Sequence, residues 1–270
     1  MTVTEQAASA STLAQKVPPR STSGKDAVII TDASKRYGVG DRSVVALDRI
    51  TLSVERGEFV CIVGASGCGK STLLSLVAGL DAPTAGTVSV PGRAALMFQD
   101  AALLPWRTAA ANVELALKLR GVAKRERRER SLDLLDLVRL KDFADKRPHE
   151  LSGGMRQRVA LARALAQDAD VLLMDEPFGA LDAITRDVLH DELERVAAEQ
   201  RLTILFVTHN VREAARLGDR IILLSSRPGR VAEEFRVDVA RPRRIESPAV
   251  SSIAAEVTVR LREEVRRHGR

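Results

Sequence analysis

The stretch Gly64-Ala-Ser-Gly-Cys-Gly-Lys70-Ser71 joins an apolar run, Glu58 to Val63, to a helical pattern, Lys70 to Ala78. It fits the pattern G-x-x-x-x-G-K-[ST] in the strand–turn–helix setting that this pattern requires. The glycines let the backbone curl so that successive N–H groups point at a phosphate chain, and the helix adds about half a positive charge at its N-terminus. The stretch therefore predicts a phosphate-binding loop, rather than a glycine-rich turn that matches by chance.

The side chains of this loop suit a nucleotide. The Lys70 ammonium can reach β- and γ-phosphates, and the Ser71 hydroxyl can bind Mg²⁺. We expect Cys68 beside the nucleotide as a reactive thiolate, favoured by the helix N-terminus and by Lys70, and Cys61 buried and inert. The alternative for Cys68 is a thiol turned away from the ligand. The candidate nucleotide contacts are Gly64, Ala65, Ser66, Gly67, Cys68, Gly69, Lys70, Ser71 and Thr72.

A second motif, Val171-Leu-Leu-Met-Asp175-Glu176-Pro177, ends an apolar strand in two acids. Open parallel sheets place their ligand crevice at the C-terminal ends of the strands. Asp175 is expected to hold Mg²⁺ through its coordinated water, and Glu176 to orient the attacking water and accept its proton. The alternative is a strand that ends in two solvated acids, which a phosphate-binding loop in the same chain disfavours.

Size and composition indicate a folded globular protein. The chain has 270 residues, 45% of them hydrophobic and 29% charged, which is enough to bury one core or one core with a helical subdomain. No apolar run approaches the ~18 residues of a membrane span, and the N-terminus lacks the pattern of a signal peptide. We therefore expect a cytosolic location, with which the two cysteines, outside any disulfide framework, agree.

The excess of basic residues does not by itself identify a binding partner. A net charge of +6 and an isoelectric point of about 9.7 suit nucleic acid, an anionic membrane surface or nucleotide phosphates. The basic residues cluster at Lys124 to Arg130, Arg241 to Arg244 and Arg260 to Arg270. We interpret these runs as solvated faces, since the first and last mix bases with acids on expected helices. Only 3% of residues are aromatic, which disfavours a platform for stacking single-stranded bases.

Hydrophobic patterns divide the chain into parts. Residues 1–26 read as a disordered leader, 27–248 as an α/β domain with a helical subdomain at about 108–166, and 249–270 as a helical tail. Strands that alternate with helices predict a parallel sheet with crossover connections. The expected strands are 27–31, 43–47, 50–54, 58–63, 86–90, 94–98, 171–175, 202–208 and 220–224, and the expected helices outside the subdomain are 70–78, 183–199, 211–217 and 253–268.

The segment Leu151-Ser-Gly-Gly-Met-Arg-Gln-Arg158 narrows the choice among phosphate-loop proteins. A serine and two glycines that open a helix make a second anion site. The segment resembles the signature of ABC ATPases, in which two copies pair head to tail and trap ATP between the phosphate loop of one and the signature of the other. Ser152, Gly153 and Gly154 would then contact the nucleotide. Met155 departs from the family's commonest residue, glutamine, which puts only the fine geometry behind the anion contact in doubt.

Further motifs of that family follow in order. By resemblance, Tyr37 stacks on adenine, Gln99 touches Mg²⁺ and the permease, Asp182 lies in the loop that crosses the dimer interface, and His209 reads the γ-phosphate. The alternatives are an ordinary edge-strand aromatic for Tyr37, and incidental polar residues for Gln99 and His209. Asn210 replaces a common aspartate, which removes a charge without removing the histidine.

The resemblance implies a P-loop NTPase core of ABC type with an antiparallel β subdomain and an inserted helical subdomain. It implies an ATPase that uses ATP and Mg²⁺, forms a homodimer, and binds permease subunits at the cytoplasmic face of the membrane, with a substrate-binding protein as an indirect partner and no nucleic acid. Similarity to nitrate, taurine and aliphatic sulfonate importers rests on the segments 97–100, 103–107, 177–182 and 227–230. Similarity to the aliphatic sulfonate subunit is greatest, because of the segments 92–97 and 237–244.

Three rival functions fit the sequence less well. A nucleic-acid ABC ATPase usually carries two cassettes or a long coiled-coil insertion, and an exporter subunit usually carries fused membrane helices; neither pattern occurs here. A non-enzymatic binding module is disfavoured by the intact Lys70, Asp175, Glu176 and His209. For Trp106 two interpretations stay open: it lines the groove for a permease helix, or it packs the helical subdomain.

Overall fold

The computed structural model describes residues 25–38 and 40–268. The predicted leader, 1–26, therefore lies almost wholly outside the described residues. The chain divides into two compact units. We call residues 90–204 the middle unit, and residues 1–89 together with 205–270 the terminal unit.

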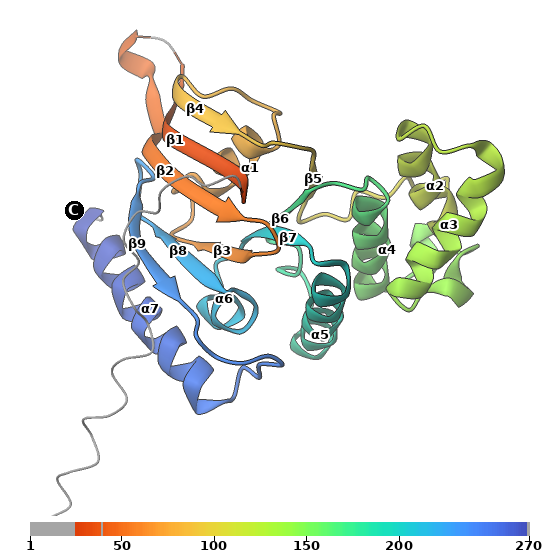
Figure 1. Cartoon of the computed structure of the whole chain (residues 1–270). Coiled ribbons are helices and arrows are strands. Elements are labelled where there is room, and N and C mark those ends of the chain that lie inside the picture. The colour runs from red at the N-terminus through yellow and green to blue at the C-terminus, as the bar shows by residue number, and fades with distance from the viewer. Residues whose placement is uncertain (1–24, 39, 269–270) are drawn as a thin grey trace, which may run out of the picture. The chain divides into compact units, whose positions relative to one another are not determined.

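The terminal unit contains a three-stranded antiparallel sheet in the order β2-β1-β4, with β1 at Asp26–Tyr37, β2 at Val44–Glu55 and β4 at Ala85–Ser89 (Figure 1). Ile30 of β1 pairs with Leu52 on one side and with Val88 on the other. The two strands expected at 43–47 and 50–54 form the single strand β2. Arg49 connects them with a left-handed φ of 48°, which lets the strand bend without ending.

The same unit contains the strands β3 (Phe59–Val63), β8 (Arg220–Leu224) and β9 (Val231–Arg236), and all but the first two residues of β7 (Thr203–Val207); their order is β7-β3-β8-β9. Every residue of β3, β7 and β8 is buried. β3 and β8 are parallel, whereas β9 runs antiparallel to β8. The sequence patterns missed β9, because it is a charged strand in which Phe235 alone is fully buried.

The helices of the terminal unit are α1 (Lys70–Val77), α6 (Val211–Leu217) and α7 (Pro248–His268), with the short 3-10 helix η1 at Gly40–Arg42. α7 begins five residues before the helix expected from 253, because Pro248 suits the first helical position and Val250 already belongs to its buried face. Arg260 of α7 forms an ion pair with Glu233 of β9 at 3.4 Å.

The middle unit pairs β5 (Ala94–Met97) with β6 (Val171–Asp175) in parallel. Its helices are α2 (Ala109–Leu119), α3 (Lys124–Leu137), α4 (Gly153–Leu165) and α5 (Ala183–Gln200), with short 3-10 turns η2 at Lys141–Phe143 and η3 at Pro148–Glu150. α2, α3 and α4 lie together in Figure 1. The bounds expected for the helical subdomain, 108–166, stay a prediction.

The α/β fold predicted from the sequence is confirmed: an antiparallel sheet, parallel-rich strands and helices are all present. Within residues 25–38 and 40–268, the helices are too short or too polar to cross a bilayer.

Candidate nucleotide site

The phosphate loop connects β3 to α1, and its shape depends on glycine. Gly67 and Gly69 have φ angles of 74° and 103°. Residues with a side chain are strained at such positive φ angles, whereas glycine adopts them freely. A Cβ at Gly69 would lie 2.7 Å from the Leu47 side chain and 2.9 Å from the Ala46 carbonyl oxygen. The loop is therefore packed directly on β2, and only glycine fits at this point.

Lys70 is 7% exposed, and its Nζ donates to the carbonyl oxygens of Gly64, at 2.9 Å, and Ala65, at 3.0 Å. These bonds curl the loop around the ammonium. Gly69 caps α1 with no side-chain acceptor, so the first N–H groups of the helix, which include those of Ser71 and Thr72, have no side-chain cap. This geometry suits an anion.

The expectation for the Cys68 side chain is wrong. Cys68 is 1% exposed, and a Cβ at Gly64 would lie 2.7 Å from its Sγ, so the thiol points into the protein. Burial raises the pKa of the Cys68 thiol, and this effect outweighs the nearby Lys70, which lowers it. The alternative, a thiol turned away from the ligand, therefore holds, although the thiol turns into the protein; only the Cys68 backbone stays a candidate contact. Cys61 is buried as predicted, and burial raises its pKa well above the ordinary value.

His209 is exposed between two residues that are held in place. Thr208 is 2% exposed; its Oγ1 donates to the Glu213 carboxylate and accepts from the Asn210 N–H at 3.0 Å. The Asn210 side chain in turn caps α6 by accepting from the Arg212 N–H at 3.1 Å. The substitution of asparagine for aspartate at 210 therefore keeps the cap, and the backbone on both sides of His209 is fixed.

Tyr37 lies at the end of β1 and is 44% exposed. Its hydroxyl donates to Asp81 Oδ2 at 3.1 Å, and Lys35 Nζ lies 5.0 Å from the ring centre and 2.5 Å from Asp81 Oδ1. The bond from Lys35 is the main cause of a lowered pKa for Asp81. β4 pairs with β1 only as far as Ser34, so at Tyr37 β1 is paired with β2 alone, and the interpretation of Tyr37 as an ordinary edge-strand aromatic stays open.

In the middle unit, the acidic pair ends the buried strand β6. Asp175 and Glu176 are partly exposed, whereas the four residues before them are buried. Glu176 has a left-handed φ of 44°, a strained conformation of the kind that clusters at functional sites. A Cβ at Gly179 would lie 3.3 Å from Gln99 Nε2 and 3.8 Å from Glu176 Oε2. The structure thus brings two predicted site residues, Gln99 and Glu176, to the same point.

The signature opens α4. Ser152 is its N-cap, with Oγ accepting from the Met155 N–H at 3.2 Å. A Cβ at Gly154 would overlap Thr185 of α5, so this glycine is also needed for helix packing. Ser152 is exposed at the helix N-terminus, where dipole and N–H groups favour an anion.

Asp182 caps α5 by accepting from the Thr185 N–H at 3.0 Å. That backbone hydrogen bond is the main cause of a lowered pKa for the carboxyl. Arg186 donates to the carbonyl oxygens of Leu181, at 2.6 Å, and Phe178, at 3.3 Å, so it holds the loop between Glu176 and Asp182. Sequence patterns missed Arg186, because a side chain bound to backbone eight residues away leaves no periodic signal.

Residues of α4 hold the segment that begins at Gln99. Gln157 Nε2 donates to the Gln99 carbonyl oxygen at 2.7 Å, and Arg163 donates to the carbonyl oxygens of Ala101, at 2.8 Å, and Ala102, at 2.7 Å. Trp106 is 69% exposed, so the interpretation that it packs the helical subdomain is wrong. An exposed indole here agrees with the groove interpretation without testing it.

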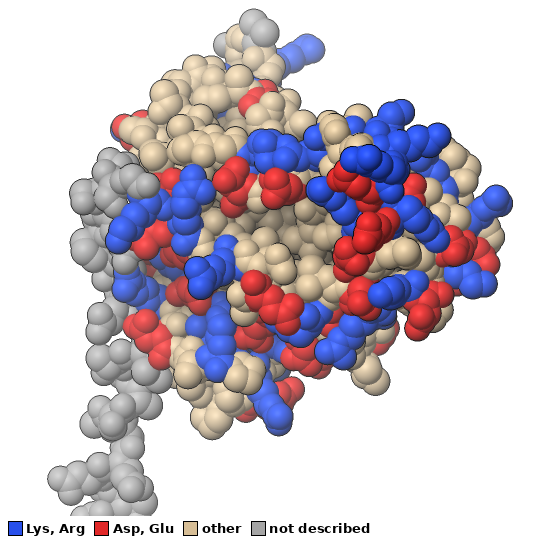
Figure 2. Space-filling model, turned by 45° about the vertical axis from the view of Figure 1, so that its right-hand side comes forward, with Lys and Arg blue, Asp and Glu red and all other residues tan. Residues whose placement is uncertain are grey.

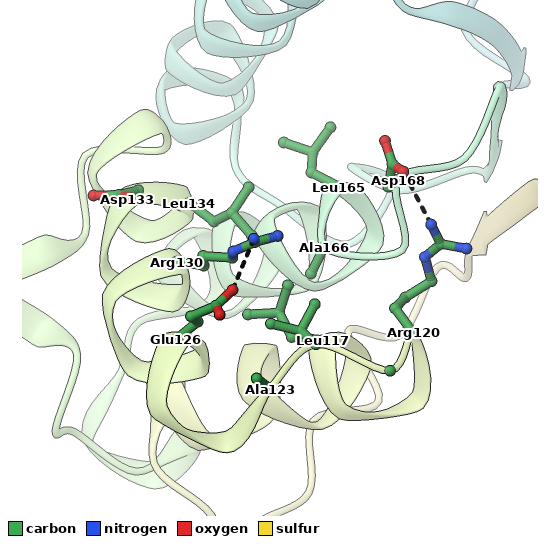
Figure 3. A pocket seen from close by; sticks show the side chains of 12 residues that line it. Leu117, Arg120, Ala123, Glu126, Arg130, Asp133, Leu134, Leu165, Ala166 and Asp168 are labelled. Carbon is green, nitrogen blue, oxygen red and sulfur yellow. Dashed lines mark hydrogen bonds and ion pairs between the residues drawn. The ribbon is translucent and has the colours of Figure 1, made fainter.

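A separate hollow of about 700 Å³ lies in the middle unit, between α2, α3 and the end of α4 (Figure 3). Two arginines in its lining are already paired: Arg120 with Asp168 at 3.0 Å, and Arg130 with Glu126 at 2.9 Å. None of the predicted site residues lines it. The rim of this hollow carries both basic and acidic side chains, and the two kinds also intermingle on the face drawn in Figure 2.

Comparison with known proteins matches residues 47–179 to the ABC transporter family. The nitrate import ATP-binding protein NrtD of Synechocystis sp. is 48% identical over 219 residues, which cover 78% of this chain and 82% of that protein. The chain belongs to the ABC transporter family. The aliphatic sulfonates import ATP-binding protein SsuB 1 of Mesorhizobium japonicum is 44% identical and covers 92% and 95% of the two chains. The taurine import ATP-binding protein TauB of Rhizobium johnstonii is 45% identical and covers 86% and 90%.

Solved structures agree with this family. The dimeric post-hydrolysis structure of the ATP-binding cassette MJ0796 with ADP and phosphate matches at a TM-score of 0.70 and 35% identity, over 79% of this chain and 100% of that one. The fold is that of an ABC cassette, and the enzyme class is that of an ABC ATPase. The roles of single residues stay predictions, which the placements above make concrete.

Proposed function

We propose that this ABC ATPase energises an importer, working as a homodimer bound to permease subunits at the cytoplasmic face of the membrane. One observation carries the proposal: a single chain contains two helix N-termini suited to anions, at α1 and at α4. Such sites complete each other when two copies pair head to tail. The import names of the relatives and the dimeric MJ0796 cassette support this reading.

The proposed chemistry divides among the residues described above. Lys70 and the N–H groups at the start of α1 bind the phosphates, and Tyr37 stacks on the adenine. Glu176 accepts a proton from the attacking water, while His209 contacts the γ-phosphate. From the second copy, the Ser152 segment contacts the same γ-phosphate, and Asp182 lies at the interface.

The residues present also fit a Mg²⁺ ion. Ser71, Gln99 and Asp175 offer hydroxyl, amide and carboxylate oxygens, the hard donors that this ion prefers. No group of three or more His, Cys, Asp or Glu side chains suited to a metal occurs among the described residues. Mg²⁺ usually keeps several waters and is bound through one or two carboxylates and the substrate phosphates. When bound, Mg²⁺ would neutralise charge on the phosphates.

Aliphatic sulfonates are the proposed solute, with nitrate or taurine as the alternative. The proposal rests on the resemblance of the segments 92–97 and 237–244. Relatives named for all three solutes fall between 44% and 48% identity, so identity alone does not choose. In the transporter, a substrate-binding protein would deliver the solute to the permease and contact this chain only indirectly.

The test is growth of a host that lacks this chain, on ethanesulfonate as the sole sulfur source. We expect no growth on ethanesulfonate, normal growth on sulfate, and rescue by the wild-type chain but not by Lys70→Ala. Normal growth on ethanesulfonate with loss of growth on taurine or nitrate would overturn the solute and leave the importer. Normal growth on all of these sources would contradict the importer itself.

A further inference from the structure

The segment Arg227-Pro-Gly-Arg230, which links β8 to β9, has no role in the site so far described. The loop that contains it is closed by its own hydrogen bonds. The Ser225 N–H donates to the Arg230 carbonyl oxygen at 2.9 Å, and the Arg230 N–H donates to Ser225 Oγ at 2.9 Å. Ser225 Oγ also donates to the Pro228 carbonyl oxygen at 2.9 Å. The loop is therefore a compact element with a fixed shape.

Gly229 of this loop lies against both β2 and the phosphate loop. Its N–H donates to the Ala46 carbonyl oxygen at 2.9 Å, and its carbonyl oxygen accepts from the Asp48 N–H at 2.9 Å. A Cβ at Gly229 would overlap the Cys68 carbonyl oxygen and lie 3.1 Å from the Leu47 side chain. This close approach places the backbone of the loop directly on the backbone of the phosphate loop.

Arg227 reaches the phosphate loop with its side chain. Its Nη2 donates to the Gly67 carbonyl oxygen at 3.3 Å. That carbonyl shares a peptide group with the N–H of Cys68, which donates to the Ala65 carbonyl oxygen at 3.2 Å and so closes a turn of the phosphate loop. A guanidinium on the carbonyl both fixes the orientation of this peptide and polarises its N–H.

Arg230, three residues later, has a different partner. Its guanidinium forms an ion pair with the side chain of Asp48 in β2, the residue whose N–H donates to Gly229. Both arginines are exposed and belong to the same loop. The chain therefore supplies a matched control: one arginine bound to the phosphate loop and one bound elsewhere.

We propose that the Ser225–Arg230 loop braces the phosphate loop, and that Arg227 is a positioning residue for nucleotide binding. The phosphate loop needs left-handed backbone at Gly67 and Gly69, a conformation that glycine loses readily when unsupported. A loop already held in its binding shape loses less entropy when nucleotide binds. The brace therefore acts on affinity for ATP and ADP rather than on the proton transfer assigned to Glu176. This inference rests on the proposed nucleotide site.

The test compares Arg227→Ala, Arg227→Lys and Arg230→Ala for binding of a fluorescent ATP analogue and for steady-state hydrolysis. We expect Arg227→Ala to raise Kd and KM about fivefold to tenfold, as for one exposed charge-assisted hydrogen bond, with kcat changed less than about twofold. Arg227→Lys should recover most of the affinity, because an ammonium can donate to the same carbonyl. Arg230→Ala should stay within about twofold of the wild type.

A second readout follows the phosphate loop directly. Peptide mapping after brief maleimide treatment measures the labelling rate of Cys68, which the brace helps to keep buried. We expect faster labelling of Cys68 in Arg227→Ala than in Arg230→Ala, with Cys61 unchanged in both as an internal control. A merely structural role would change both arginine variants alike and would label both cysteines.

The outcomes separate the brace from the function on which it rests. A wild-type chain that binds no nucleotide contradicts the proposed site, whatever the variants do. A wild-type chain that binds ATP, with Arg227→Ala equal to it in Kd and in Cys68 labelling, overturns the brace alone. A loss in Arg230→Ala as large as that in Arg227→Ala, or a fall in kcat with unchanged KM, overturns it as well.

Discussion

Gln157, one turn into the signature helix α4, donates from Nε2 to the backbone carbonyl oxygen of Gln99 at 2.7 Å. The Gln157 side chain is 6% exposed, whereas Gln99 is exposed, so this bond is partly buried. It connects the helix opened by Ser152 to the segment that carries Gln99. A sequence pattern does not predict this bond, because it joins a side chain to a backbone carbonyl 58 residues away.

We expect Gln157→Leu to lower the free energy of unfolding by about 0.5–1.5 kcal/mol, because the partly buried hydrogen bond to the Gln99 carbonyl is lost while the side-chain volume is kept. Urea unfolding followed by circular dichroism measures it. The control is Gln200→Leu, at an exposed position at the end of α5, which should change little. Equal stability of Gln157→Leu and the wild type would show that the bond contributes nothing.

Glu176→Gln should bind ATP with unchanged affinity and hydrolyse it about 10²- to 10⁴-fold more slowly, because it removes the proposed base and keeps the shape. An ATP-bound dimer should accumulate. Hydrolysis and size-exclusion chromatography with ATP provide the measurement. Hydrolysis near the wild-type rate would remove Glu176 from this role.

Cys68 should react slowly with maleimide near neutral pH. Burial raises the pKa of its thiol, so the fold favours the neutral form and the thiolate appears only at higher pH than in a free cysteine. Unfolding in guanidinium should make Cys68 and Cys61 react at similar rates. Rapid labelling of Cys68 in the native chain at neutral pH would contradict the inward orientation.

Asp182→Ala should destabilise the chain near neutral pH, and the difference from the wild type should shrink in acid. The pKa of Asp182 is lowered by its bond from the Thr185 N–H, so its contribution is present above the unfolded pKa and lost as pH falls through the folded pKa. Asp182→Asn, which keeps a cap acceptor, should restore most of the stability. Thermal unfolding measured at several pH values checks this. A difference in Tm between Asp182→Ala and the wild type that does not vary with pH would argue against the cap.

The strands that bury apolar residues could be predicted from the sequence, and so could the phosphate loop. β3 and β8 are largely apolar runs. The phosphate loop was predictable because its strand, glycines and helix are adjacent in the sequence around Lys70. β9 could not be predicted, because its charged residues hide the alternation around Phe235. The continuity of β2 through Arg49 depends on a backbone conformation that composition does not reveal.

The sequence predicted which residues form the candidate site and their order along the chain, but not which atoms of these residues contact one another. Cys68 was misplaced because its direction depends on how the whole loop packs against β2. Gln157, Arg186 and Arg227 act through hydrogen bonds from a side chain to backbone carbonyl oxygens. Such bonds follow from tertiary packing, which has no period along the chain.

The central claim is that the nucleotide site is shared between two copies, so that Lys70 and Ser152 act from opposite chains. Lys70→Ala and Ser152→Ala should each hydrolyse ATP poorly alone. In a mixed dimer, one of the two sites would keep both an intact Lys70 and an intact Ser152, while the other would lose both.

The most direct test is to mix the two variants, after fluorescence energy transfer between labelled copies has shown that subunits exchange. The account predicts hydrolysis well above the sum of the two separate variants, approaching the activity of one intact site per mixed dimer. Hydrolysis that never exceeds that sum, with exchange demonstrated, would contradict the shared site.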